Sequence, residues 1–121
     1  MTLYFYLLLV KHAVADLWLQ GRFNSKPHLG EKEQLLKPKL YLHSLDHAIL
    51  TGIITLLFAG IYWAVIIALL DFVLHSIIDY CKRIYTLRKK VSQKHSMFWK
   101  IQALDQIAHF SCYLIYIIMV Y

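Results

Sequence analysis

Pairs of histidine or aspartate residues four positions apart recur along the 121-residue chain. Residues with this spacing lie on one face of an α-helix, so both members of a pair can reach the same neighbour. Imidazole and carboxylate groups are ligands for zinc, iron, nickel or copper. If the fold brings the pairs together, they predict a metal centre. The pairs are His12 with Asp16, His43 with His47, His75 with Asp79, and Asp105 with His109.

The segments that carry these pairs are long apolar runs. The composition is 60% hydrophobic and only 17% charged, which excludes an ordinary soluble domain, a disordered chain and a disulfide scaffold. The runs at 3–20, 42–62, 63–81 and 98–121 approach the ~20 residues with which a helix crosses a bilayer. The sequence therefore predicts one all-α domain, a bundle of four transmembrane helices, with a tight hairpin near Gly60. A cleaved signal peptide is the alternative for the first run, and the polar interruptions of that run disfavour it.

The basic residues predict an orientation. The connections at 21–41 and 82–100 hold five and seven of the thirteen lysine and arginine residues. Basic loops stay on the cytoplasmic side, so both loops are expected in the cytoplasm and both termini outside. The predicted location is the inner (plasma) membrane, crossed several times. A basic run beside a helix end, here LRKKVSQKH (87–95), commonly contacts anionic lipid headgroups, which disfavours nucleic acid as the partner.

Ionisable residues inside apolar helices must be compensated. An aspartate near the centre of a spanning helix costs about 2.5–3.5 kcal/mol, so it must be paired, protonated or bound to a ligand. Counting about 1.5 Å per residue from the cytoplasmic helix ends places the eight residues in two tiers. The deeper tier comprises His12, His47, His75 and His109, and the shallower tier comprises Asp16, His43, Asp79 and Asp105.

The ligand set predicts one or two divalent ions, with zinc expected, because imidazole and carboxylate ligands suit this metal and about three protein ligands hold each ion. The carboxylates of Asp16, Asp79 and Asp105 are the candidate catalytic groups. A structural or proton-relay network is an alternative use of the same residues. A haem held by two facing histidines is a weaker alternative, because it leaves the aspartates without a purpose.

Other polar residues near the pairs are candidates for a supporting role, either orienting the ligands or binding an anion. Taken singly, each is more commonly a capped helix end or a snorkelling side chain. The two cysteines, Cys81 and Cys112, form no spacing pattern typical of a disulfide or a zinc-thiolate site. The supporting candidates are Gln20, Asp71, Lys82 and Gln106.

These blocks resemble a known family. The segments HAVADLWLQ (12–20), HSIIDYCK (75–82) and DQIAH (105–109), together with the His43 and His47 pair, are similar to the small bacterial and phage membrane proteins grouped as domain of unknown function 3307. The resemblance covers nearly the whole chain and is specific only in combination. The segment HSIID also resembles an element of membrane proteins labelled metal-dependent hydrolases, a more distant similarity. The first family's name implies no activity.

The leading functional expectation is a metal-dependent hydrolase that acts on a lipid or phospho-ester near the cytoplasmic leaflet. Two non-enzymatic alternatives use the same residues. In one, the cluster is part of a cation or proton transport element. In the other, a structural ion joins four short helices, with no open coordination position and no open cleft. The sequence leaves open the metal, the substrate and the oligomeric state.

Overall fold

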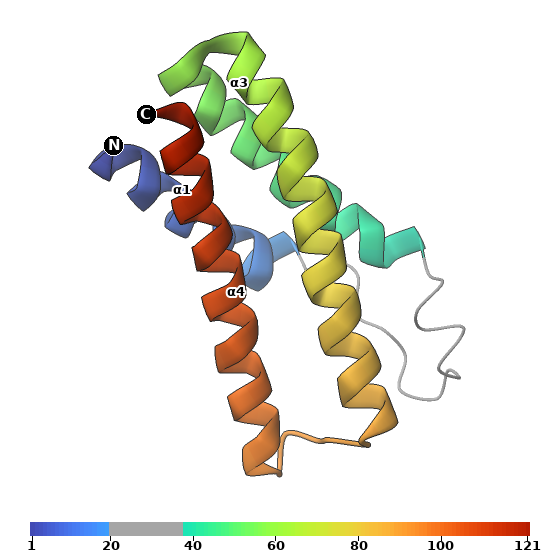
Figure 1. Ribbon diagram of the computed structural model, residues 1–121. Helices are drawn as coiled ribbons and strands as arrows, with labels where there is room; N and C mark the ends of the chain where they lie inside the picture. The colour runs from blue at the N-terminus through green and yellow to red at the C-terminus, as the bar shows by residue number, and fades with distance from the viewer. Residues whose placement is uncertain (20–37) are drawn as a thin grey trace.

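The computed structural model describes residues 1–19 and 38–121, most of which are helical (Figure 1). Helix α1 (Thr2–Val14) continues into a π-helical turn, η1 (Ala15–Leu19). Helix α3 (Pro38–Arg88) and helix α4 (Ser96–Val120) follow. The all-α prediction is confirmed. Gln20 and most of the first basic connection lie outside the described residues.

Helix α3 reverses direction at Gly60, which forms two antiparallel arms, 38–59 and 61–88 (Figure 1). The backbone of Gly60 has φ 78° and ψ 176°, a conformation that a side chain disfavours and glycine adopts readily. The structure therefore contains the predicted hairpin and places its turn at Gly60 rather than between 62 and 63. The second arm also continues beyond Cys81 to Arg88, because no glycine or proline interrupts the segment 82–88.

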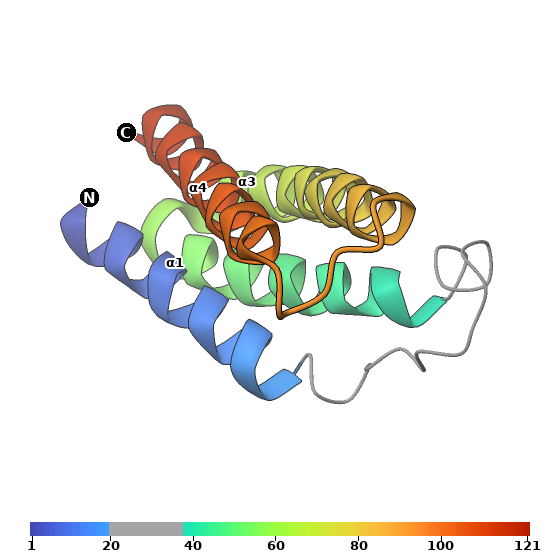
Figure 2. The same ribbon diagram turned by 90° about the horizontal axis from the view of Figure 1, so that it is seen from below.

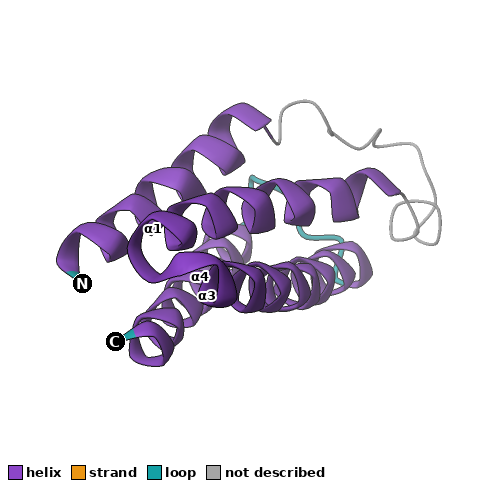
Figure 3. Ribbon diagram, turned by 90° about the horizontal axis from the view of Figure 1, so that it is seen from above, coloured by secondary structure: helices purple, strands orange, loops and turns teal. Residues whose placement is uncertain are grey.

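The four helical segments form a two-layer bundle. Figures 2 and 3 show α1 beside the first arm of α3, and α4 beside the second arm. Both termini lie at the Gly60 end, where the ring of Tyr4 is 5.4 Å from that of Phe58 and 6.2 Å from that of Tyr121. The turn at 89–95 lies at the opposite end (Figure 1).

Two helical stretches, Tyr41–Arg88 and Ser96–Val120, are long and apolar enough to cross a membrane. The first of them contains the Gly60 reversal. Crossing by all four segments, and the orientation of the termini, stay predictions.

Burial of polar and apolar side chains is inverted relative to a soluble protein. The side chains of His47, Thr51 and Thr55 are completely buried, whereas those of Leu57 and Ile118 are 76% and 78% exposed. An apolar core exists mainly toward the Gly60 end, where tyrosines pack with aliphatic side chains. Its fully buried members are Tyr4, Leu8, Ile67, Tyr113 and Tyr116.

Small residues allow the two arms of α3 to approach closely. A Cβ atom added at Gly52 would lie 3.1 Å from the Cβ of Ala68 on the facing arm. Ala48, one turn before Gly52, and Ala64, one turn before Ala68, are both buried. This pattern of small residues four apart is typical of closely packed helices. It fixes the separation of the arms that carry four of the eight candidate ligands.

Replacing Gly52 with leucine should therefore force the arms apart. We expect Gly52→Leu to lower the free energy of unfolding by about 1–3 kcal/mol, because the added atoms overpack the contact with Ala68. The measurement is unfolding in detergent followed by circular dichroism. Ile53→Leu, at the exposed neighbouring position, is the control and should change little. Equal stability of the two variants would contradict the close approach.

Candidate metal centre

The structure brings the predicted histidines together in the middle of the bundle. The ring of His75 stacks between those of His47 and His109, with centroid distances of 3.8 and 4.0 Å. The ring of His12 lies 5.0 Å from both His47 and His109. The ring of His43 lies 4.6 Å from His47. All five rings are buried, so side chains from four helical segments share one interior site.

Two groups of potential ligand atoms occur among the described residues, and both include His75. One consists of Asp16, His43, His47 and His75, and the other of His75, Asp79 and His109. Within each group the ligand atoms lie within 4.8 Å of one another. A ligand distance of about 2.1 Å places two ligands of one ion at most about 4 Å apart, so a small inward movement would complete either group.

His75 is the central residue of the site and has an unsatisfied nitrogen. Its ring is 1% exposed, and no described residue forms a hydrogen bond with its Nδ1 atom. Its Nε2 atom lies 3.5 Å from Asp79 Oδ2, at the outer limit of a hydrogen bond. Buried polar atoms without a partner are rare in native proteins and need an explanation.

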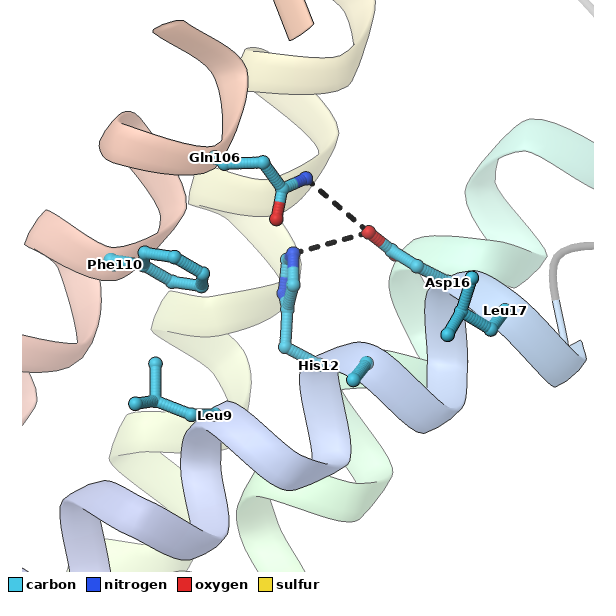
Figure 4. A pocket seen from close by; sticks show the side chains of 7 residues that line it. Leu9, His12, Asp16, Leu17, Gln106 and Phe110 are labelled. Carbon is cyan, nitrogen blue, oxygen red and sulfur yellow. Dashed lines mark hydrogen bonds and ion pairs between the residues drawn. The ribbon is translucent and has the colours of Figure 1, made fainter. Parts of the chain in front are cut away.

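Asp16 lies between the histidines and the exposed edge of the site, and its two carboxylate oxygens face different neighbours. The Oδ1 atom lies 3.1 Å from His47 Nε2 and 3.4 Å from His43 Nε2. The Oδ2 atom lies 3.2 Å from His12 Nε2 and 3.5 Å from Gln106 Nε2 (Figure 4). Asp16 belongs to the π-helical turn η1, a local geometry that is frequent at functional sites. Its side chain is 27% exposed, so the site is accessible at this carboxylate.

Asp105 is held in position by a lysine. Lys82 Nζ donates to Asp105 Oδ2 at 3.0 Å and lies 3.9 Å from Asp79 Oδ1. His109 Nε2 lies 3.3 Å from Asp79 Oδ1 and 3.5 Å from Asp105 Oδ1. Gln106 also donates to Asp105, at 3.3 Å. Of the supporting candidates, Lys82 and Gln106 thus contact the carboxylates directly.

Six of the eight predicted ligands belong to the two groups, and His12 and Asp105 do not. The Nδ1 atom of His12 shares a hydrogen bond of 2.7 Å with the hydroxyl of Tyr113, and its Nε2 faces Asp16. Asp105 is paired with Lys82 and His109. Both residues are therefore placed to orient the ligands rather than to complete a group.

A buried ion pair on the Gly60 side of the site was not predicted from the sequence. Lys11 Nζ lies 3.1 Å from Asp71 Oδ2, and both side chains are at most 3% exposed. Thr51 donates to the same oxygen at 2.6 Å, and the Tyr116 hydroxyl donates to Oδ1 at 2.9 Å. Lys11 Nζ also lies 3.3 Å from His47 Nδ1, so the pair contacts the histidine cluster.

Asp71 is one of the supporting candidates predicted from the sequence, and the spacing contains a signal for the other residues as well. Asp71 precedes His75 by four positions, Thr51 follows His47 by four, and Tyr113 follows His109 by four. Each one extends the stripe of a predicted pair by one helical turn. Lys11 stands alone in an apolar run, which requires an acidic partner.

A cleft of about 310 Å³ lies between α1 and α4 and borders the site (Figure 4). His12, Asp16 and Gln106 form its polar side. Its remaining lining is apolar: Leu9, Ala13, Leu17 and Phe110. The site is therefore open on the side of α1 and α4.

The chain belongs to the family described as "Protein of unknown function (DUF3307)", which matches residues 4–121. The family resemblance of its sequence blocks is thereby confirmed. Neither a curated protein nor a solved structure matches the chain. The comparisons therefore establish the family and leave the activity to be argued from the site.

The Lys11–Asp71 pair should contribute strongly to stability. We expect Lys11→Met and Asp71→Asn each to lower the free energy of unfolding by about 3–5 kcal/mol, because each leaves a buried charge without its partner. The double variant should lose less than the sum of the single losses. Unfolding in detergent measures all three, with Lys100→Met, at an exposed position, as the control. Strictly additive losses would show that the two charges do not interact.

Proposed function

We propose that this member of the DUF3307 family is a multi-pass inner-membrane protein that binds a divalent cation, zinc by its ligand set, and hydrolyses a lipid ester or phospho-ester near the cytoplasmic leaflet. The observation that carries the proposal is the position of His75. Its buried ring belongs to both ligand groups and has a nitrogen for which no described residue provides a hydrogen bond. A buried ring that belongs to both groups and lacks a partner on one nitrogen favours a bound ion over a purely structural network.

The distribution of side chains supports the membrane setting. Apolar residues cover the outer surface, whereas ionisable residues face the interior, as a helix bundle in lipid requires. In this proposal α1 with η1, the two arms of α3, and α4 each cross the bilayer once. The turn at 89–95 carries basic residues at its edges and lies on the cytoplasmic side, with both termini outside.

The donor set supports zinc rather than haem. Nitrogen and oxygen ligands from four helical segments suit a small divalent ion. The rings of His47, His75 and His109 stack at 3.8 and 4.0 Å, which leaves no space for a porphyrin between them. Because His75 is common to both groups, we propose one ion for each chain.

Asp16 is the carboxylate best placed for acid-base chemistry. A divalent cation in the site would polarise an ester or phosphoryl oxygen and make a water molecule more acidic. Asp16 Oδ1 faces the histidines, while Oδ2 faces the cleft, where a proton from water can be accepted. Gln106 and His12 hold Oδ2 in position. Asp79 is also partly exposed and is the second candidate base, whereas Asp105 is paired with Lys82 and positions His109.

The open cleft distinguishes the proposal from a structural ion. A staple would enclose its ion with protein ligands on all sides. Here the ligand Asp16 is 27% exposed and borders a cleft of about 310 Å³. This geometry is typical of a site that admits a reactant.

Transport of a cation or proton is a second candidate, favoured by the polar groups beyond the site. Asp71 and Thr51 extend the polar interior toward the Gly60 end, and the hydroxyls of Tyr4 and Thr55 share a hydrogen bond at 2.8 Å. However, the Thr55 hydroxyl donates to the backbone carbonyl of Thr51 rather than to its side chain. The hydroxyl groups therefore do not form a continuous proton path, and we prefer the hydrolase.

Elemental analysis of the full chain purified in mild detergent tests the metal. We expect about one divalent ion for each chain, because the two ligand groups share His75. His75→Ala should lose the ion, since both groups lose a ligand. His95→Ala, in the exposed turn, is the matched control and should retain it. Equal metal content in both variants would refute the site, and a Soret band in the purified protein would identify haem instead.

The same preparations, reconstituted in phospholipid vesicles, test hydrolysis. Wild type should release soluble products from the vesicle lipids. Asp16→Asn should release far less per bound ion, a comparison that is needed because Asp16 also belongs to one ligand group. A wild-type protein that carries the ion and yet releases nothing would reject the hydrolase in favour of the structural ion.

The orientation predicts which residues can be labelled from outside the cell. In a chain carrying Cys81→Ser and Cys112→Ala, Thr2→Cys should react with a membrane-impermeant maleimide once the inner membrane's outer face is accessible. Ser92→Cys should react only after the inner membrane is permeabilised. Both positions are exposed in the structure, so access depends on the side of the membrane. Labelling of Ser92→Cys before permeabilisation would reverse the proposed topology.

A further inference from the structure

We propose that the cleft between α1 and α4 holds part of one acyl chain of a glycerolipid without net charge, which enters sideways from the bilayer. This inference rests on the proposed function for its membrane setting and names the substrate class of the same site. Three features of the cleft carry it: the apolar walls, the polar end and the charges nearby.

The apolar walls of the cleft include residues that are exposed on the outer surface of the bundle. Leu17 is 83% exposed and Phe110 is 36% exposed, so both line the cleft and also reach the surface. Leu104 and Ile107, on the outer surface of α4, are 66% and 60% exposed. A hydrocarbon chain can therefore pass from the surroundings into the cleft without leaving an apolar environment.

The inner end of the cleft is polar. His12, Asp16 and Gln106 line it, and the oxygen of Asp16 that faces His12 and Gln106 is Oδ2. The other oxygen, Oδ1, contacts His43 and His47. A chain lying against the walls would thus place its ester end beside Oδ2, one carboxylate away from the histidine cluster. This is the position that hydrolysis of the ester requires.

The charges favour a lipid without net charge over an anionic one. No lysine or arginine of the described segments lines the cleft, and its ionisable groups are Asp16 and His12. Two lysines of the described residues that contact the site are paired with other groups, Lys11 with Asp71 and Lys82 with Asp105. In the metal-free protein the Asp16 carboxylate, in this apolar environment, repels an anion strongly. A zwitterionic headgroup avoids this repulsion because its charges compensate each other.

The size of the cleft limits the occupant to part of a lipid. Its volume of about 310 Å³ lies at the lower end of the ~300–1,000 Å³ of pockets that bind small ligands. It can enclose a segment of one chain and the adjoining ester. The second chain and the headgroup would remain outside, in the bilayer.

Photo-crosslinking tests the inference directly. The full chain is reconstituted in vesicles that contain a trace of phosphatidylcholine with a diazirine in one acyl chain, and the labelled residues are mapped by mass spectrometry after irradiation. We expect Leu9 and Phe110 to be labelled several-fold more than Leu57 and Ile118, which are outward-facing and more exposed. The same photoreactive group on phosphatidylglycerol, an anionic lipid, should label the cleft several-fold less.

A blocking variant and a matched control distinguish labelling inside the cleft from labelling by lipid that only touches the outer surface. Ala13→Trp fills the cleft and should remove the excess labelling. Val14→Trp places the same side chain on the neighbouring residue, which is 40% exposed and does not line the cleft, and should retain it. Circular dichroism verifies that both variants fold.

Three results would overturn the inference: uniform labelling of all outward-facing residues, full labelling of Ala13→Trp, or stronger labelling by phosphatidylglycerol. The experiment is repeated after metal chelation, because lipid occupancy needs neither an ion nor turnover. Cleft labelling in a protein that binds no ion would sustain the lipid site and reject the hydrolase. Metal-dependent hydrolysis without cleft labelling would sustain the hydrolase and reject the lipid site.

Discussion

The structure depends on ionisable side chains that pair with one another inside an apolar bundle, because such pairing offsets the free-energy cost of burying each group. These groups leave the apolar exterior only if all the segments turn them inward, because every helical segment carries at least two of them. Each segment solves the problem in the same way, by placing its polar residues on one stripe four residues apart. The stripes then face inward together. Packing of the helices and formation of the polar site are consequently one event rather than two.

The compensation differs between the two levels of the interior. At the level of Lys11 and Asp71 it is complete, because the carboxylate accepts from the lysine, Thr51 and Tyr116. At the level of the histidines it is incomplete, because the Nδ1 atoms of His43 and His75 have no hydrogen-bond partner among the described residues. A fully satisfied pair rigidifies the bundle, whereas unsatisfied nitrogens retain capacity to bind. The level of Lys11 and Asp71 thus anchors the helices, and the level of the histidines remains available for a ligand.

The eight residues of the site could be predicted from the sequence because spacing determines which residues share a helix face. The glycine between two long apolar runs predicted the hairpin near Gly60. The two depth tiers stay a prediction. Spacing could not predict that Lys11 pairs with Asp71, since the relative rotation of two helices decides which stripes touch. Nor could it divide the oxygens of Asp16 between the histidines and the cleft, because that division depends on the π-helical turn at Ala15–Leu19. Gln20 lies outside the described residues, so its role stays a prediction.

The strongest competing interpretation is a network of hydrogen bonds without an ion. Such a network accounts for the ring of His47 but not for the ring of His75. For His47 the network suffices: Lys11 lies 3.3 Å from Nδ1, and Asp16 accepts from Nε2 at 3.1 Å. For His75 it fails, because Nδ1 has no partner and Nε2 reaches Asp79 only at 3.5 Å. A network under selection for stability alone would not leave its central ring without a partner at Nδ1, since an unpaired buried group costs about 1–3 kcal/mol. An ion bound by His75 would add a partner to this ring, and it would give Asp16 a reason to face both the histidines and the cleft.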